Sequence, residues 1–60
     1  MKFEIQLLRY GTWRTIATRA TLDEAEYAVA DIRMGEAGDP HPNEYRVLVV
    51  DGAYVEEAHP

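Results

Sequence analysis

Two histidines and a set of acidic side chains are the groups best suited to metal binding or acid–base chemistry in this chain of 60 residues. Asp39 and His41 lie in 35–43, a predicted loop with two glycines and two prolines, and His59 is next to the last residue. Carboxylate and imidazole groups bind divalent metals, but no spacing among these three side chains fixes a coordination geometry. The sequence therefore predicts no metal site and no cofactor.

The usual catalytic nucleophiles are scarce. The chain has no cysteine and no serine, so threonine hydroxyls are the nucleophiles that remain. Gly35 and Gly38 do not follow a strand and open a helix, so they do not form a phosphate-binding loop. A domain of this size also lacks the concavity that ligand sites need. We predict that the protein is not an enzyme.

The charge is unevenly distributed, with a net value of −5. Residues 1–20 hold four basic side chains and one acidic one, whereas residues 21–60 hold two arginines and ten carboxylates. An acidic body disfavours binding to phosphates, which requires Lys and Arg. Nucleic-acid binding therefore stays a weaker alternative, carried by the predicted N-terminal hairpin. The side chains that would carry it are Arg9, Trp13, Arg14 and Arg19.

Residues 2–19 predict a β-hairpin, because polar and apolar side chains alternate with a period of two. Gly11 and Thr12 suit a two-residue type II′ turn, in which glycine takes the first central position. This turn pairs Leu7 with Ile16, and paired residues share a face. The expected core face carries Phe3, Ile5, Leu7, Ile16, Thr18 and Ala20.

A helix is predicted to follow the hairpin. Thr21 and Glu24 have the spacing of a capping box, in which the Thr21 hydroxyl accepts a hydrogen bond from the Glu24 N–H. The helix is expected to end near Met34, with Gly35 as a left-handed cap. Apolar side chains recur at helical spacing and should pack on the sheet. They are Leu22, Ala25, Ala28, Val29 and Ile32.

Residues 44–50 predict a third strand. Asp51 and Gly52 suit a type I′ turn, after which residues 53–57 form either a short fourth strand or a tail. A helix that crosses over the first strand places the third strand beside it, so that every pair is antiparallel. The expected fold is α+β, with ββαβ or ββαββ order, an antiparallel sheet and one helix on one face. It forms a single domain over residues 1–60.

Two surfaces are candidates for binding a partner. One helix covers only one face of the sheet, and the other face should carry more apolar surface than a monomer leaves in water. The third strand adds to it Leu48 and Val50 in one register, or Tyr45, Val47 and Val49 in the other. The outer face of the helix has apolar side chains flanked by acidic ones, which suits a basic partner, although a plain solvated face is the simpler interpretation. The partner-binding candidates are Leu8, Tyr10 and Trp13 on the sheet, and Tyr27, Met34, Asp23 and Asp31 on the helix.

Two short segments carry a family resemblance. Gly11–Arg14 (GTWR) followed by Thr21–Ala25 (TLDEA) resembles the AP2-type N-terminal arm domain of phage integrases. The resemblance implies a three-stranded sheet with one helix, and DNA binding through a basic sheet face. This chain is acidic and has no lysine-rich sheet, so the resemblance is used here for the architecture alone.

These features predict a small acidic protein that binds a protein partner and performs no catalysis. Phages and mobile elements use such proteins as accessory or inhibitor proteins, and an acidic surface can compete for the nucleic-acid-binding site of a host protein. The alternative is a structural module that self-associates as a homodimer. The sequence has no run of about 18 apolar residues, so no membrane span is predicted. The N-terminus also lacks the apolar core of a signal peptide. The lack of cysteine favours the cytoplasm.

Overall fold

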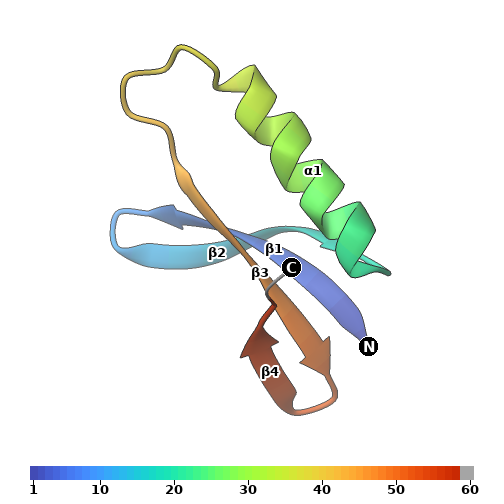
Figure 1. Ribbon diagram of the computed structural model, residues 1–60. Coiled ribbons are helices and arrows are strands. Elements are labelled where there is room, and N and C mark those ends of the chain that lie inside the picture. Colours follow the sequence, from blue (N-terminus) through green and yellow to red (C-terminus); the bar gives the residue numbers. More distant parts are fainter. Residues whose placement is uncertain (59–60) are drawn as a thin grey trace.

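The computed structural model describes residues 1–58 and places one helix against an antiparallel sheet (Figure 1). Over these residues the sheet has four strands in the order β2-β1-β3-β4. This confirms the predicted α+β fold and decides between the two element orders in favour of ββαββ. The elements are β1 (Lys2–Arg9), β2 (Thr12–Arg19), α1 (Leu22–Gly35), β3 (Glu44–Asp51) and β4 (Tyr54–Glu57).

The loop of the first hairpin lies one residue earlier than predicted. Tyr10 and Gly11 form it, with φ values of 52° and 76°, and two positive values are what a type I′ turn requires. Thr12 already belongs to β2 and pairs with Arg9. The predicted type II′ turn is therefore wrong.

A β-bulge in β2 changes which side chain reaches the core. The register shifts so that Gln6 pairs with Thr15 while Ile5 pairs with Ala17. The extra residue, Ile16, stays 44% exposed, and Ala17 packs against the core instead. The prediction that Ile16 faces the core is wrong, because a bulge leaves one residue without a cross-strand partner. The other two side chains expected in the core from this segment, Thr18 and Ala20, are exposed.

Helix α1 begins at the predicted cap. Thr21 has extended backbone geometry, and its hydroxyl accepts a hydrogen bond from the Glu24 N–H at 3.2 Å. At the other end Gly35 is the last helical residue and Glu36 is the C-cap with φ −97°, so the predicted left-handed cap at Gly35 is wrong. No helix in the described part of the chain is long and apolar enough to cross a membrane.

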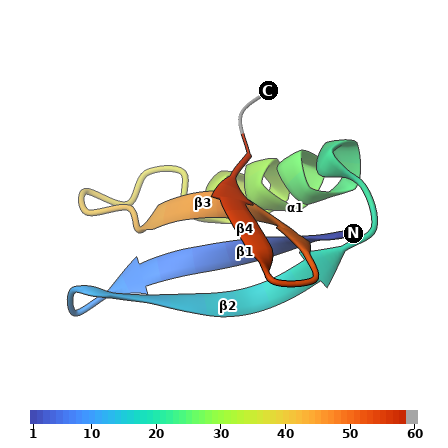
Figure 2. The ribbon, with the colours of Figure 1, turned by 90° about the horizontal axis from the view of Figure 1, so that it is seen from below.

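The hydrophobic core lies between α1 and one face of the sheet (Figure 2). Ile5 and Ala25 are fully buried, and Val29 and Val47 are almost so. Full burial of a side chain such as that of Ile5 stabilises a fold by about 1.5–3 kcal/mol. With so few buried side chains, the stability of this domain depends strongly on each of them. Partly buried side chains complete the core: Phe3, Ala17, Leu22, Ala28, Tyr45 and Ala58.

Strand β4 pairs with the second half of β3. Asp51 pairs with Tyr54, so the loop is formed by Gly52 and Ala53, one residue later than predicted. Gly52 has a φ of 61°, whereas Ala53 has a negative φ, which fits a type II′ turn and not the predicted type I′ turn. The first half of β3, residues 44–46, has no strand beside it on this edge in the described chain.

Candidate functional site

The face of the sheet opposite α1 is called the open face here, because no other element covers it in the described chain (Figure 2). Successive side chains of a strand point to opposite faces. Ile5 lies in the core, so its neighbour Gln6 and the residue paired with it, Arg46, lie on the open face. Of the two alternatives for the third strand, the structure selects Leu48 and Val50 for this face.

Two of the three binding candidates on the sheet lie together. Leu8 pairs directly with Trp13, and both side chains are half-buried. Tyr10 does not join them, because it occupies the turn and is 97% exposed. Its ring lies instead 6.0 Å from the guanidinium carbon of Arg9. The open face therefore presents Leu8 and Trp13 as one pair.

Trp13 is held by a side chain that the sequence analysis did not select. The guanidinium carbon of Arg46 lies 4.2 Å from the centre of the Trp13 ring, a distance at which a cation and an aromatic ring attract each other. The Nε of Arg46 also donates a hydrogen bond to Gln6 Oε1 at 2.8 Å. The two contacts hold the guanidinium group of Arg46 against the Trp13 ring.

A chain of polar contacts continues from this stack across the open face. Gln6 Nε2 donates to Thr15 Oγ1 at 3.1 Å, and the Thr15 hydroxyl donates to Glu4 Oε1 at 2.9 Å. Lys2 forms an ion pair with Glu4 at 3.4 Å. Although Leu48 belongs to this face, it is only 9% exposed. The open face is thus less apolar than expected, because ordered polar side chains lie across it.

The four helix candidates lie on two different sides of the exposed surface of α1. Tyr27 and Met34 are 78% and 76% exposed. Tyr27 borders a hollow between α1 and β2 together with Asp23 and Asp31. Met34 borders a different groove, between α1 and β3. The structure therefore brings three of these residues together and separates the fourth from them.

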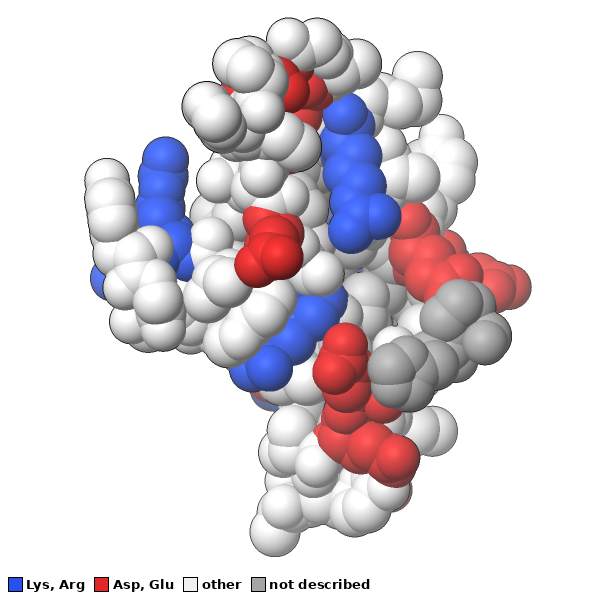
Figure 3. Space-filling view, turned by 60° about the vertical axis from the view of Figure 1, so that its left-hand side comes forward, with Lys and Arg blue, Asp and Glu red and all other residues white. Residues whose placement is uncertain are grey.

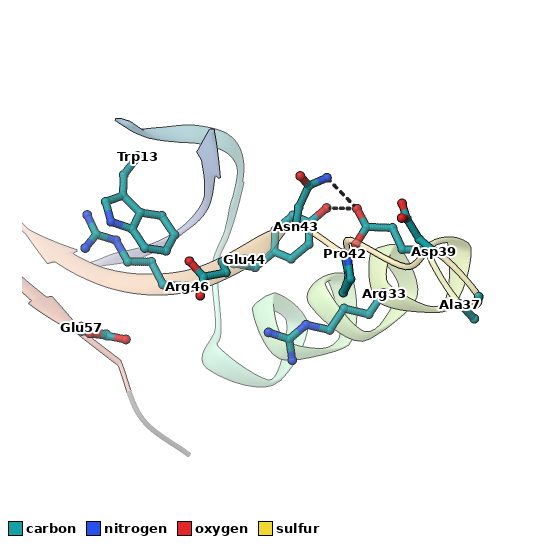
Figure 4. A pocket seen from close by; sticks show the side chains of 12 residues that line it. Trp13, Arg33, Ala37, Asp39, Pro42, Asn43, Glu44, Arg46 and Glu57 are labelled. Carbon is teal, nitrogen blue, oxygen red and sulfur yellow. Dashed lines mark hydrogen bonds between the residues drawn. The ribbon is translucent and has the colours of Figure 1, made fainter. Parts of the chain in front are cut away.

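A hollow of about 780 Å³ lies where the loop before β3 meets the sheet, with Trp13 and Arg46 at one end (Figure 4). Within it Glu36 Oε1 accepts hydrogen bonds from the Tyr45 hydroxyl at 2.6 Å and from the Asn43 amide at 2.9 Å. These two bonds lower the pKa of Glu36 below its usual 4.5, and the carboxylate raises the pKa of Tyr45 above 10.0. The ionised Glu36 thereby ties the end of α1 to the start of β3.

The metal candidates do not form a site in the described chain. The Asp39 carboxylate accepts a hydrogen bond from the His41 backbone N–H at 2.9 Å, which is the local turn that Asp side chains commonly stabilise. His59 lies outside the described residues. Over residues 1–58, no three His, Cys, Asp or Glu side chains gather closely enough to hold a metal ion.

The nucleic-acid candidates do not form one patch. Arg9 and Arg14 border a hollow at the tip of the first hairpin, whereas Arg19 borders the hollow beside α1. Trp13 lies on the open face, stacked with Arg46. Figure 3 shows basic and acidic side chains interspersed on the face that it displays. A continuous basic surface is not present on that face.

Comparison with protein-family models gives no match, and comparisons with curated proteins and with solved structures give none either. The resemblance to integrase arm domains therefore has no family match to support it. The function has to be argued from the surfaces of the molecule itself.

Proposed function

We propose that the protein is a non-enzymatic interaction protein that binds another protein through the open face. The stack of Trp13 on Arg46 carries this proposal. Tryptophan and arginine are among the residues that most often dominate the energy of protein interfaces. Because contacts within the chain already hold this pair, a partner would lose little free energy in ordering it.

The surroundings of the stack also suit an interface. Leu8 lies beside Trp13, and Gln6, Thr15 and Glu4 supply hydrogen-bonding groups in fixed positions next to it. Protein interfaces combine a less polar centre with a polar rim in this way. The open face therefore offers an anchor and an ordered polar surround.

The acidic composition supports a partner with a basic contact surface. The net charge of the chain is −5, and complementary charge steers partners together and excludes like-charged ones. The nucleic-acid-binding site of a host protein is a basic surface of this kind. We therefore extend the proposal to an accessory or inhibitor protein, of the kind that phages and mobile elements encode, that occupies such a site.

Affinity capture from the native host tests the proposal, followed by affinity measurement on the purified partner. The wild type is compared with Trp13→Ala and with Tyr27→Ala, a matched loss of an exposed aromatic ring on the helix. We expect Trp13→Ala to weaken binding about 30-fold, as loss of an interface anchor does, and Tyr27→Ala to leave it within about twofold. Equal binding by the wild type and a folded Trp13→Ala would reject the open face. Binding that does not respond to salt would reject the basic contact.

Self-association is the second candidate function, and the edge of the sheet favours it. Strand β2 has eight residues and, over residues 1–58, pairs with β1 alone, and a free strand edge is a template for pairing with another chain. Sedimentation of the wild type and Trp13→Ala over a range of concentrations tests it. A wild type that stays monomeric at high concentration would reject self-association, and a dimer unchanged by Trp13→Ala would exclude the open face as its contact.

A further inference from the structure

A groove of about 610 Å³ runs along α1 on the side that faces β3 and β4. We call it the helix groove. Val29 and Val47 lie at its base, where the core reaches the surface, and Ala30 and Ala58 also line it. Its base lies on the helix side of the sheet, and it reaches the open face at Arg46. The helix leaves this strip of apolar surface uncovered in the described chain.

Met34 borders the helix groove and is 76% exposed. Methionine is flexible and polarisable, so it adapts to different apolar side chains and is common on surfaces that bind peptides. Together with the apolar base, Met34 offers a place for an apolar side chain of a partner.

Two carboxylates along the groove lack part of their hydrogen bonding. One oxygen of Glu26 and one of Glu36 are shielded from solvent without a hydrogen-bond partner, and they are the two side-chain atoms in this condition over residues 1–58. Glu26 lines the helix groove, and Glu36 lines the hollow of Figure 4, which shares Arg33 and Tyr45 with the groove. An unpaired carboxylate oxygen is costly, and a Lys or Arg side chain that reached the free oxygen of either group would supply the missing hydrogen bond.

The charge balance points to the same kind of ligand. The groove and the adjoining hollow are lined by five carboxylates and two guanidinium groups. One of the two guanidinium groups, that of Arg46, is already engaged by Trp13 and Gln6. The surface is therefore apolar at its base and acidic around it, which complements a segment that is apolar and basic.

We propose that the helix groove binds a short segment of a partner protein in which an apolar side chain is flanked by Lys or Arg. The apolar side chain packs on Val29, Val47 and Met34, and the basic ones pair with Glu26 and Glu36. This goes beyond the binding proposed for the open face, since it names a second surface and the chemistry of what it holds.

Three eight-residue peptides test the chemistry on the full chain. One alternates leucine and arginine, one alternates serine and arginine, and one alternates leucine and glutamate. Amide chemical shifts locate each peptide, and fluorescence anisotropy measures its affinity at several salt concentrations. We expect binding of the leucine–arginine peptide alone, with shifts centred on Ala30, Met34 and Val47 and weaker binding at higher salt. Equal binding of the serine–arginine or leucine–glutamate peptide would overturn the proposal.

Matched variants test the position. Met34→Ser is expected to weaken binding of the leucine–arginine peptide about fivefold, because part of an apolar contact is lost. Tyr27→Ser, on the side of α1 that faces β2, should change the affinity less than about twofold. Glu26→Gln should weaken it about threefold, as loss of a surface ion pair does, whereas Asp23→Asn should have a smaller effect. If Tyr27→Ser and Asp23→Asn weaken binding as much as their counterparts, the helix groove is not the site.

One further variant separates this inference from the open-face proposal. A folded Leu8→Ala should bind the peptide within about twofold of the wild type, because Leu8 lies beside Trp13 on the open face and lines neither the groove nor the hollow. If Leu8→Ala loses the peptide while Met34→Ser keeps it, the peptide binds the open face and the inference about the groove is wrong.

Discussion

Two neighbouring cross-strand pairs of β1 and β3 show how differently the two faces of this sheet are built. Ile5 pairs with Val47, and both side chains are buried against α1. In the adjacent pair Gln6 lies opposite Arg46, and their side chains share a hydrogen bond of 2.8 Å on the open face. The first pair stabilises the fold by removing apolar surface from water. The second stays in contact with water.

This difference divides the tasks of the sheet. A hydrogen bond that remains accessible to water adds little net free energy to folding, so the polar side chains of the open face are not needed to hold the domain together. They do order the groups that a partner would meet, Trp13 above all. The covered face therefore provides stability, and the open face is free to carry specificity.

The largest effect is expected from the covered face. Ile5→Ala should reduce the free energy of unfolding by about 2–5 kcal/mol, which is comparable with all that a core in so small a domain supplies. The variant should be largely unfolded at 25 °C by circular dichroism. Ile16→Ala, at the exposed bulge, is the control and should cost less than about 1 kcal/mol. Similar losses for both variants would contradict a division between the two faces.

A smaller loss is expected from the cap that starts the covering helix. Thr21→Ala removes the hydroxyl that accepts from the Glu24 N–H and should cost about 1 kcal/mol. Urea unfolding measures the loss. Thr21→Ser keeps an oxygen in place and should stay close to the wild type. If serine and alanine are equally destabilising, the cap does not contribute as the structure indicates.

The open face should show a weaker coupling. Trp13→Ala, Arg46→Ala and the double variant form a cycle whose coupling energy should be about 0.5–1 kcal/mol, the range for a cation–π pair that is partly exposed. Urea unfolding of the four proteins gives the value. A coupling near zero would mean that the stack seen on the open face contributes nothing in solution.

The smallest effect concerns the bond between Glu36 and Tyr45. Tyr45→Phe removes the main cause of the lowered pKa of Glu36, so that pKa should rise toward 4.5. Nuclear magnetic resonance titration of the side-chain carboxyl measures it, and Tyr54→Phe is the control. An unchanged pKa of Glu36 in Tyr45→Phe would contradict the hydrogen bond.

The same bond predicts how stability changes with pH. Because the pKa of Glu36 is lowered by folding, its contribution is present above 4.5 and is lost as the pH falls through the lower folded-state pKa. Because the pKa of Tyr45 is raised, its contribution is present below 10.0 and is lost as the pH rises through the higher folded-state pKa. Tyr45→Phe should flatten both changes in a urea-unfolding series.

The turns show how far local sequence could predict this fold. Each hairpin has a single glycine near its tip, and both loops were placed one residue away from their true positions. A glycine can serve as the second central residue of a type I′ turn or the first of a type II′ turn. At the first turn the ambiguity was resolved by Tyr10, which adopts a positive φ of 52°. Nothing in its residue type indicated this, since such values are uncommon outside glycine, asparagine and aspartate.

The candidate site was predicted in part for a similar reason. Leu8 and Trp13 were placed on one face from the alternation of a single hairpin, and they do pair. Arg46 lies far from them in the sequence, and its face depends on the register between β1 and β3. A shift of one residue in that register would exchange the two faces of β3. The sequence left both registers open, so it could not place Arg46 on Trp13.

The amino-acid sequence by itself determined the first three strands, the helix and the helix cap at Thr21, because alternation, helical spacing and capping act over a few residues, whereas it left the fourth strand open. It also determined that one helix would leave one face of the sheet uncovered. The tertiary structure decided the two turns, the bulge at Ile16 and the stack of Arg46 on Trp13. These depend on how strands align across the sheet, and that alignment is set by packing of the whole core, which no local segment contains.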